Sequence, residues 1–375
     1  MHTAAREHNE IKTRKTRAVV NSASTRRTPL PEKARFRPYD ENGARGRMSA
    51  VKRLIYRLWR LGGFAALARF LAQRRLKIVL YHGVCPSVEG LFNYRRKFIA
   101  PQSFERQITY FTRHYTILPL DEAVMRLYAG KLPPRALAIT FDDGYRNNYE
   151  YAFPILKKYG VPATVFLATD FVFDNTPLWV DRLEHATAHG SESVYEKKGM
   201  DNRMRSEMKT LSEAEKIRRL EAIERKRGAA LTDARADVRY APLEPHMLEE
   251  MQKAGIAFGA HTKSHPILSR ISLDDARTEI TESIDVVKNI CTLVSRVFAY
   301  PNGQPGDWTN DIEDMLIKHD FDSALTTVEG TNGASAPRMR LKRISMDDTD
   351  DWDSFVAAES GLRGILQELK KVWSY

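Results

Sequence analysis

Two adjacent carboxylates, Asp142 and Asp143, follow an apolar run and precede a glycine in the sequence Ala-Leu-Ala-Ile-Thr-Phe-Asp-Asp-Gly, residues 136–144. Neighbouring carboxylates repel each other unless a cation or a hydrogen-bond network relieves the repulsion. At the end of a strand they can divide two tasks, one holding a divalent metal and the other acting as a base toward water. Asp-Asp-Gly is also ordinary turn composition, so this pattern alone favours a turn.

A pair of histidines, His261 and His265, follows another predicted strand, which ends at residue 260. Histidines four residues apart can face one cation from a helical turn or a compact loop. By itself the pattern is more typical of an exposed loop. Together with an aspartate at a second strand end it gives an Asp-His-His set with open positions for water and substrate, which a hydrolytic metal site needs.

A third motif, Phe-Ala-Tyr-Pro-Asn-Gly at residues 298–303, also follows a predicted strand. Such a turn can direct backbone N–H groups toward a developing oxyanion, although without the other motifs it indicates only a tight turn.

Short apolar strands alternate with helical segments after residue 75, which predicts a parallel sheet with helical crossovers. In a barrel of this kind the catalytic residues lie at the carboxyl ends of the strands. Five residues would lie there: His82, Asp142, Asp143, His261 and Asn302. Residues 174–245 interrupt the alternation with a highly charged helical stretch, and we interpret them as an insertion or lid. A helix over residues 355–373 closes the chain.

The composition is typical of a globular protein, with 42% hydrophobic and 29% charged residues among 375. A chain of this length can bury one large core and carry an extension. Its two cysteines, Cys85 and Cys291, provide neither a disulfide framework nor a cysteine-rich metal site. It contains no run of 18 apolar residues that would span a membrane as a helix.

The net charge of +11 resides in the N-terminal arm, because residues 1–77 have a net charge of +15 and residues 78–375 one of −4. A nucleic-acid-binding body would carry its own basic patch, so this distribution disfavours nucleic acid as a partner. Residues 1–47 are arginine-rich and poor in large apolar residues, and we expect a disordered basic extension there. Met48 is an alternative start of translation.

Residues 48–75 predict a basic amphipathic helix, in which apolar residues alternate with Arg57, Arg60 and Arg69. Two interpretations stay open: a helix lying on an anionic membrane surface, or a helix packed on the domain with its arginines in solvent. The sequence shows no clear secretory signal. We therefore expect a cytoplasmic protein or one peripheral at the inner membrane face, with a periplasmic or secreted protein as the alternative.

In order and spacing, the Thr-Phe-Asp-Asp-Gly, His-Thr-x-x-His and Ala-Tyr-Pro-Asn-Gly motifs resemble those of the polysaccharide deacetylase family, the NodB-homology domain of carbohydrate esterase family 4. The resemblance covers roughly residues 76–350. The segments at residues 80–84, 177–181 and 340–344 resemble the branch that deacetylates exopolysaccharides. The resemblance implies a distorted, incomplete (β/α)7-type barrel. After it, residues 351–375 form the segment of the C-terminal helix expected from the sequence pattern.

The resemblance also implies roles for single residues. Asp142 would be the general base, and a backbone N–H near Asn302 would hold the oxyanion. Tyr300 and Trp179 would contact the substrate. A divalent metal, usually zinc, would be bound by Asp143, His261 and His265. The implied reaction is hydrolysis of N-acetyl groups on amino sugars of a polysaccharide, oligosaccharide or lipid-linked glycan, with release of acetate.

Two departures from the family pattern concern the groups around the base. Many members carry an arginine that steadies the catalytic aspartate, at the position of Ala299 here, and a tyrosine at the position of Asn302. Many also supply a general acid from a late Leu-x-His motif, and no such motif follows residue 303. His319 is expected at the surface. His82 is therefore the candidate for the acid or a substrate contact, with a structural histidine as the alternative.

Three other functions are compatible with parts of the sequence. A non-catalytic saccharide-binding protein on the same barrel would not need Asp142 beside a complete metal set. A metal-dependent amidase acting on a small cyclic amide would use the same chemistry, although the basic arm and the segment around Trp179 suit a polymer or lipid-linked glycan better. A nucleic-acid binder using residues 1–60 is the least favoured.

Overall fold

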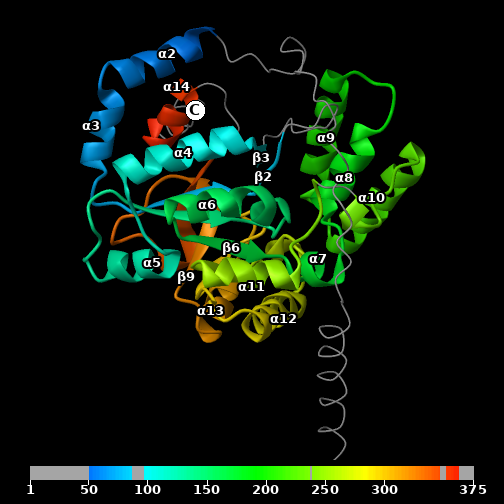
Figure 1. Cartoon of the computed structure of the whole chain (residues 1–375). Helices are drawn as coiled ribbons and strands as arrows, with labels where there is room; N and C mark the ends of the chain where they lie inside the picture. Colours follow the sequence, from blue (N-terminus) through cyan, green and yellow to red (C-terminus); the bar gives the residue numbers. More distant parts are fainter. Residues whose placement is uncertain (1–49, 87–96, 237–238, 347–351, 363–375) are drawn as a thin grey trace, which may run out of the picture. The chain divides into compact units, whose positions relative to one another are not determined.

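The computed structural model describes residues 50–86, 97–236, 239–346 and 352–362 (Figure 1). The expectations for residues 1–47 and for residues after 362 lie outside these ranges. Every pairing between the named strands of the described residues is parallel. The strands are β1 (Lys77–Tyr81), β2 (Gly83–Val84), β3 (Phe98–Ile99), β4 (Thr116–Ile117), β5 (Ala136–Phe141), β6 (Ala163–Leu167), β7 (Ile256–Ala260), β8 (Val297–Ala299), β9 (Ser323–Glu329) and β10 (Leu341–Ser345).

The main sheet is nearly closed on itself. Its strand order is β7-β6-β5-β1-β10-β9-β8, with the short β4 paired to β5, while β2 and β3 form a separate pair. At the seam between β7 and β8, the N–H of Phe258 donates to the carbonyl of Leu293 (2.9 Å), and the N–H of Ser295 donates to the carbonyl of Phe258 (2.7 Å). The incomplete parallel barrel that the sequence predicted is therefore confirmed.

Helices surround the barrel, and their sequences explain their positions. The helix α12 (Leu273–Ile290) begins at Ser272, whose hydroxyl accepts a hydrogen bond from the N–H of Asp275 (3.1 Å). Its buried residues recur at helical spacing, at Ala276, Ile280, Ile284 and Val287. The other helices around the barrel are α4 (Pro101–His114), α5 (Leu120–Tyr128), α6 (Phe153–Tyr159), α7 (Thr169–Asp174), α11 (Pro245–Lys253) and α13 (Asn310–Lys318).

Three helices stand together at one flank within residues 174–245 (Figure 1): α8 (Trp179–Ala188), α9 (Val194–Met208) and α10 (Glu213–Arg227). They share an apolar cluster of their own, which includes Trp179, Leu183, Met208 and Leu220. Arg182 of α8 also donates two hydrogen bonds to the carboxylate of Glu224 on α10 (2.9 and 2.7 Å). The domain boundaries drawn from the sequence stay predictions.

The N-terminal helical segment differs from the single helix expected over residues 48–75. It forms two helices, α2 (Ala50–Leu61) and α3 (Phe64–Leu71), because the chain turns at Gly62 and Gly63, and Gly63 adopts a positive φ of 77°. No helix among the described residues is long and apolar enough to cross a membrane.

The helix expected over residues 355–373 is interrupted within the described residues. The helix α14 covers Trp352–Glu359 and is followed by a turn at residues 360–361, and the expected part after residue 362 lies outside the described residues. Gly361 adopts a positive φ of 89°, the conformation in which glycine commonly ends a helix.

A buried ionic cluster joins α3, α4 and α14 to the start of β1. Lys77, only 3% exposed, donates to the hydroxyl of Tyr115 and to the carbonyl of Glu359 (both 2.6 Å), and lies 3.5 Å from the Glu359 carboxylate. Arg69 and Tyr110 each donate to the same carboxylate at 2.7 Å. Glu359 therefore carries the charge that balances a buried lysine.

Replacing Glu359 with Gln should lower the free energy of unfolding by about 3 kcal/mol, because Lys77 would keep its buried charge and lose its carboxylate. Urea denaturation followed by circular dichroism measures this change. The matched control is Glu249→Gln, which removes an exposed partner of Lys253 and should leave stability unchanged. Equal stabilities of the two variants would show that the Glu359 cluster contributes no net stability.

Candidate active site

The residues that the sequence predicts for the active site lie together on one rim of the barrel. The strand β1 leads into His82, β5 into Asp142 and Asp143, β7 into His261, and β8 into the turn at residues 300–303. Neighbouring parallel strands end on the same side of a barrel, so residues far apart in the sequence become neighbours. His82, the two aspartates and the histidines line one cavity of about 460 Å³.

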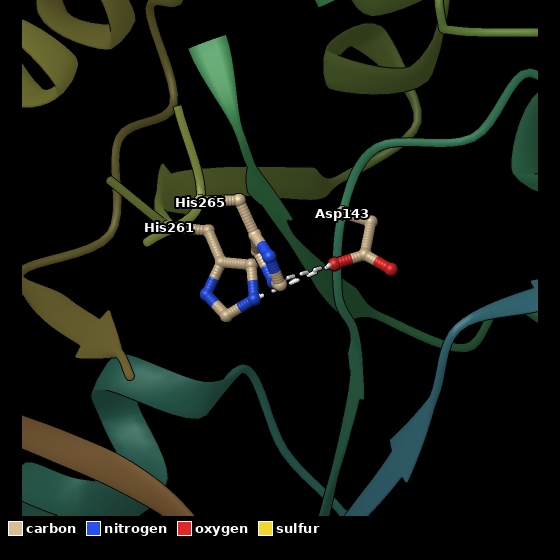
Figure 2. A group of neighbouring side chains, drawn as sticks. All are labelled: Asp143, His261 and His265. Carbon is tan, nitrogen blue, oxygen red and sulfur yellow. Dashed lines mark ion pairs between the residues drawn. The ribbon is translucent and has the colours of Figure 1, made fainter. Parts of the chain in front are cut away.

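Asp143, His261 and His265 point toward one another from two loops (Figure 2). The Nε2 atoms of His261 and His265 lie 3.5 and 3.4 Å, respectively, from Oδ1 of Asp143. The potential ligand atoms of these three buried residues all lie within 4.8 Å of one another. Two imidazole nitrogens and a carboxylate oxygen suit first-row divalent cations. The three residues therefore fit a bound divalent metal.

A backbone carbonyl orients the imidazole of His261. Nδ1 of His261 lies 2.7 Å from the carbonyl oxygen of Ala299 in β8. A carbonyl can only accept a hydrogen bond, so Nδ1 carries the proton and Nε2 is the nitrogen left for a cation. Metal-binding histidines are commonly held in this way through their second nitrogen.

The protonation states of the three residues also favour the binding of a cation. Burial opposes the charge of Asp143, but the hydrogen bond with His261 and the interactions with the neighbouring imidazoles outweigh it, and the pKa of Asp143 lies well below its usual value. Burial lowers the pKa of His265 to about 3, so this imidazole is neutral at pH 7. Burial also disfavours the charge of His261, but Asp142 and Asp143 outweigh it and raise its pKa. A cation would compete with that proton.

Four residues of the three motifs have backbone conformations that non-glycine residues rarely adopt. Their φ angles are positive: 78° at Asp143, 65° at Thr262, 63° at His265 and 60° at Asn302. Each such conformation costs about 1–3 kcal/mol and persists only where the surrounding structure holds it. Such strain clusters at sites of binding and catalysis.

The loop between the two histidines is held by α12 and by the start of α7. The carboxylate of Glu279 on α12 accepts hydrogen bonds from the N–H groups of Lys263 (2.9 Å) and Ser264 (2.8 Å). The N–H of Thr169 donates to the carbonyl of Thr262 (3.2 Å). These contacts fix the loop in the conformation that brings His265 to Asp143.

Asp142 forms a two-pronged ion pair with Arg343 of β10. Nη1 and Nη2 of Arg343 each lie 2.7 Å from one oxygen of the Asp142 carboxylate, and Nε donates to the carbonyl of Thr326 (2.8 Å). Both side chains are buried. Burial would raise the pKa of Asp142, but Arg343 and then His261 outweigh it, and the pKa lies below its ordinary value. Asp142 is thus ionised at neutral pH.

Arg343 is the functional residue that the sequence reasoning missed. The family pattern has its arginine at position 299, where this chain has alanine, and the structure supplies one from a different strand. The sequence offers only a weak signal, two adjacent basic residues in the short strand Leu-Lys-Arg-Ile-Ser, in which the structure exposes Lys342 and buries Arg343. A charged residue inside an apolar strand requires a buried partner of opposite charge.

His82 lines the cavity directly after β1. Burial lowers its pKa, against the opposing influence of Asp143 and Asp142, so its imidazole is neutral at pH 7. The structure places it beside both aspartates, as the position after a strand predicts. Its role as acid or substrate contact stays a prediction.

Tyr300 does not have the position expected for a substrate contact. Its side chain is 1% exposed and belongs to the apolar cluster of β8, α12 and α13, where its ring stacks on Trp308 at a centroid distance of 4.8 Å. It is absent from the lining of the cavity. The chain turns at Pro301, so the side chain that precedes this proline faces the core and Asn302 faces the cavity.

Asn302 and Trp179 both line the cavity. The side chain of Asn302 donates to Asp307, and its carbonyl accepts a hydrogen bond from the hydroxyl of Thr327 (2.5 Å), which fixes the turn. Trp179 begins α8, and the ammonium of Lys216 lies 4.8 Å from its ring centroid. Trp179 thereby makes the three-helix flank part of the wall of the cavity.

The sequence profile described as polysaccharide deacetylase matches residues 129–324, more than half of the chain. The chain belongs to the polysaccharide deacetylase family. The matched segment of this family member contains both aspartates, both histidines and the turn after β8. It ends before Arg343.

Individual relatives match shorter segments. The protein YxkH of Bacillus subtilis is 30% identical over 116 residues, which are 31% of this chain and 40% of YxkH. Poly-beta-1,6-N-acetyl-D-glucosamine N-deacetylase of Staphylococcus epidermidis is 40% identical over 75 residues, 20% of this chain and 26% of that enzyme. The matches thus span less than half the length of these relatives.

Solved structures of similar fold extend the comparison. The Streptococcus pyogenes deacetylase PplD, in complex with acetate, superposes with a TM-score of 0.52 at 20% identity, covering 76% of this chain and 98% of PplD. BC0361, a polysaccharide deacetylase from Bacillus cereus, has a TM-score of 0.50 at 18% identity, covering 76% and 68% of the two chains. This family member therefore shares their fold.

Replacing His265 with Ala or Asp143 with Asn should weaken binding of a divalent cation by at least about 100-fold, because each change removes one of three donors. Titration calorimetry with zinc sulfate, together with elemental analysis of dialysed protein, measures the loss. The control is His246→Ala, which removes an exposed histidine near α11. Unchanged affinity in the two site variants would exclude this triad as the metal site.

Proposed function

We propose that this protein is a metal-dependent N-deacetylase that hydrolyses N-acetyl groups on amino sugars of a polysaccharide, oligosaccharide or lipid-linked glycan and releases acetate. The observation that carries the proposal is the ionised Asp142, held by Arg343 in the same cavity as the Asp143–His261–His265 triad. A base and a metal site that share one cavity are what amide hydrolysis requires.

The two aspartates have different tasks because their partners differ. Arg343 donates to both oxygens of Asp142 and keeps it ionised, so this carboxylate can accept a proton from water in the cavity that it shares with the triad. Asp143 faces the two histidines and serves as a ligand. When bound there, a divalent cation would supply Lewis-acid chemistry toward the acetamide oxygen and lower the pKa of water.

Asp142 removes one proton from water while the water oxygen forms a bond to the acetamide carbon. His82 is the candidate donor to the leaving nitrogen; since burial keeps its imidazole neutral at rest, it must first gain a proton, and the proton that Asp142 took from water is passed on to it. The carbon–nitrogen bond breaks as the nitrogen receives this proton, and a free amine and acetic acid result. The acetic acid releases the second proton of the water to solvent as acetate forms, and Asp142 is again ionised and His82 again neutral.

The nitrogen-rich donor set supports zinc as the metal, because zinc accepts imidazole and carboxylate ligands and leaves open positions in catalytic sites. Other divalent cations of the first transition row bind the same set. Trp179 is part of the cavity wall, but its side chain is only 5% exposed and Lys216 lies over its ring, so its contact with a saccharide stays a prediction.

The second candidate is a saccharide-binding protein without catalysis. This candidate is disfavoured because burying the charged side chain of Asp142 costs free energy. A binding protein gains nothing from a buried carboxylate that needs a buried arginine for compensation.

Replacing Asp142 with Asn should lower kcat by about 10³-fold, because the amide cannot accept a proton. Mass spectrometry of N-acetylglucosamine oligomers and lipid-linked glycans, with added zinc and with chelator, measures acetyl loss. The control Asp274→Asn alters an exposed carboxylate of α12 and should retain full activity. Full activity of Asp142→Asn would overturn the base assignment. Absence of acetyl loss from every substrate with the metal-loaded protein would overturn the proposed function.

Replacing Arg343 with Met should lower kcat by about 100-fold and shift the acid limb of the pH–rate profile to higher pH. Arg343 holds the pKa of Asp142 down, so without it the carboxylate is protonated up to a higher pH and the base is lost there. The matched control is Arg340→Met, three residues earlier, whose partner Glu313 lies outside the cavity. An unshifted acid limb would contradict this role for Arg343.

A further inference from the structure

The helices α2 and α3 expose most of the large apolar side chains on the surface of the described residues. Eight of the thirteen large hydrophobic residues that are exposed there lie between residues 54 and 71, with exposures of 43% to 73%. Scattered exposed hydrophobic residues are normal, but a contiguous cluster of this kind marks an interaction surface.

The cluster lies on one face of each helix. Leu54, Leu58 and Leu61 of α2 follow one another at intervals of four and three residues and thus share one stripe. On α3 the stripe consists of Phe64, Leu67 and Leu71, at intervals of three and four residues. We call these six residues the apolar face.

The opposite sides of both helices hold them on the barrel, so the apolar face is directed away from the core. Tyr56 and Ala65 are buried, and Tyr56 packs with residues at the end of α14. Arg60 pairs with Asp353 of α14, and Arg69 with Glu359. In Figure 1 both helices lie along the edge of the fold, next to α14 and α4. The usual pattern, a polar outer side on a surface helix, is reversed here.

The charge around the apolar face has a single sign. Residues 48–77 contain eight lysines and arginines and no aspartate or glutamate. Arg53 and Arg57 are exposed on α2, and Arg74 and Arg75 are exposed after α3. An apolar face bordered by cations is complementary to a surface that is apolar inside and anionic at its boundary.

We propose that the apolar face of α2 and α3 binds the surface of a bilayer rich in anionic lipids, with the two helices lying in the plane of the interface. A second copy of this chain is a poorer occupant, because it would bring two sets of arginines together. Residues 1–47 are a poorer occupant as well, since they hold twelve lysines and arginines against five acidic residues.

Vesicle flotation of the full chain tests the proposal, with vesicles of phosphatidylcholine alone or with 30% phosphatidylglycerol. The unaltered protein should bind the mixed vesicles. Combined Leu54→Gln, Leu58→Gln and Leu67→Gln changes should weaken binding by at least about tenfold. The matched control combines Met125→Gln, Leu273→Gln and Ile317→Gln, three exposed hydrophobic residues elsewhere, and should bind like the unaltered protein.

A variant with fewer positive charges separates the electrostatic contribution to vesicle binding from the apolar one. Arg53→Gln with Arg57→Gln should weaken binding by about tenfold, and less so as salt rises, because cations near an anionic surface are screened. The control is Lys131→Gln with Lys157→Gln, two exposed lysines on other elements. Equal thermal midpoints of all variants show that each is folded.

The variants above should lose vesicle binding, and a further variant should gain a fluorescence signal from it. Leu58→Trp should show quenching of tryptophan fluorescence by brominated acyl chains above that of the unaltered protein, whereas Met125→Trp should not. The proposal is overturned if the triple leucine variant binds as well as its control, or if the new tryptophan is not quenched. It is also overturned if light scattering shows a dimer that the leucine changes dissociate while no variant binds vesicles.

Discussion

The ion pair between Asp142 and Arg343 is the interaction on which the rest of the site depends. Two opposite charges buried in a barrel are stable only as partners, since either one alone would lose its hydration without compensation. The pair spans β5 and β10, which both flank β1. The strands β5, β1 and β10 must therefore lie side by side in the order observed before Asp142 can be buried with its partner. The pairing of β5, β6 and β7 places the triad beside it.

The active site also contains backbone conformations that cost conformational free energy. Asp143, Thr262, His265 and Asn302 all lie in the left-handed region, one or two in each motif. Contacts from α12, α7 and β9 maintain these conformations, so elements far from the cavity in sequence contribute to its geometry. Glu279, Thr169 and Thr327, which lie outside the motifs, thus help to hold these strained residues in place.

The sequence could predict the features that are encoded locally. The helices at residues 101–114 and 120–128 follow from hydrophobic periodicity, and the acidic and histidine motifs follow from strand ends with unusual composition. The partner of Asp142 could not be found in this way, because Arg343 lies 201 residues away and only the strand order brings the two together. The motif alone also could not show that Tyr300 packs in the core, because the direction of its side chain depends on the bend of the chain after it.

The seam of the barrel has a consequence for the triad. His261 follows β7 on one side of the seam, and the carbonyl of Ala299 that fixes its imidazole belongs to β8 on the other. Separation of these strands would release the ring from the tautomer and orientation that a cation requires. Occupancy of the triad and closure of the barrel are therefore thermodynamically linked, because a cation that requires this orientation of His261 would also stabilise the contact between β7 and β8.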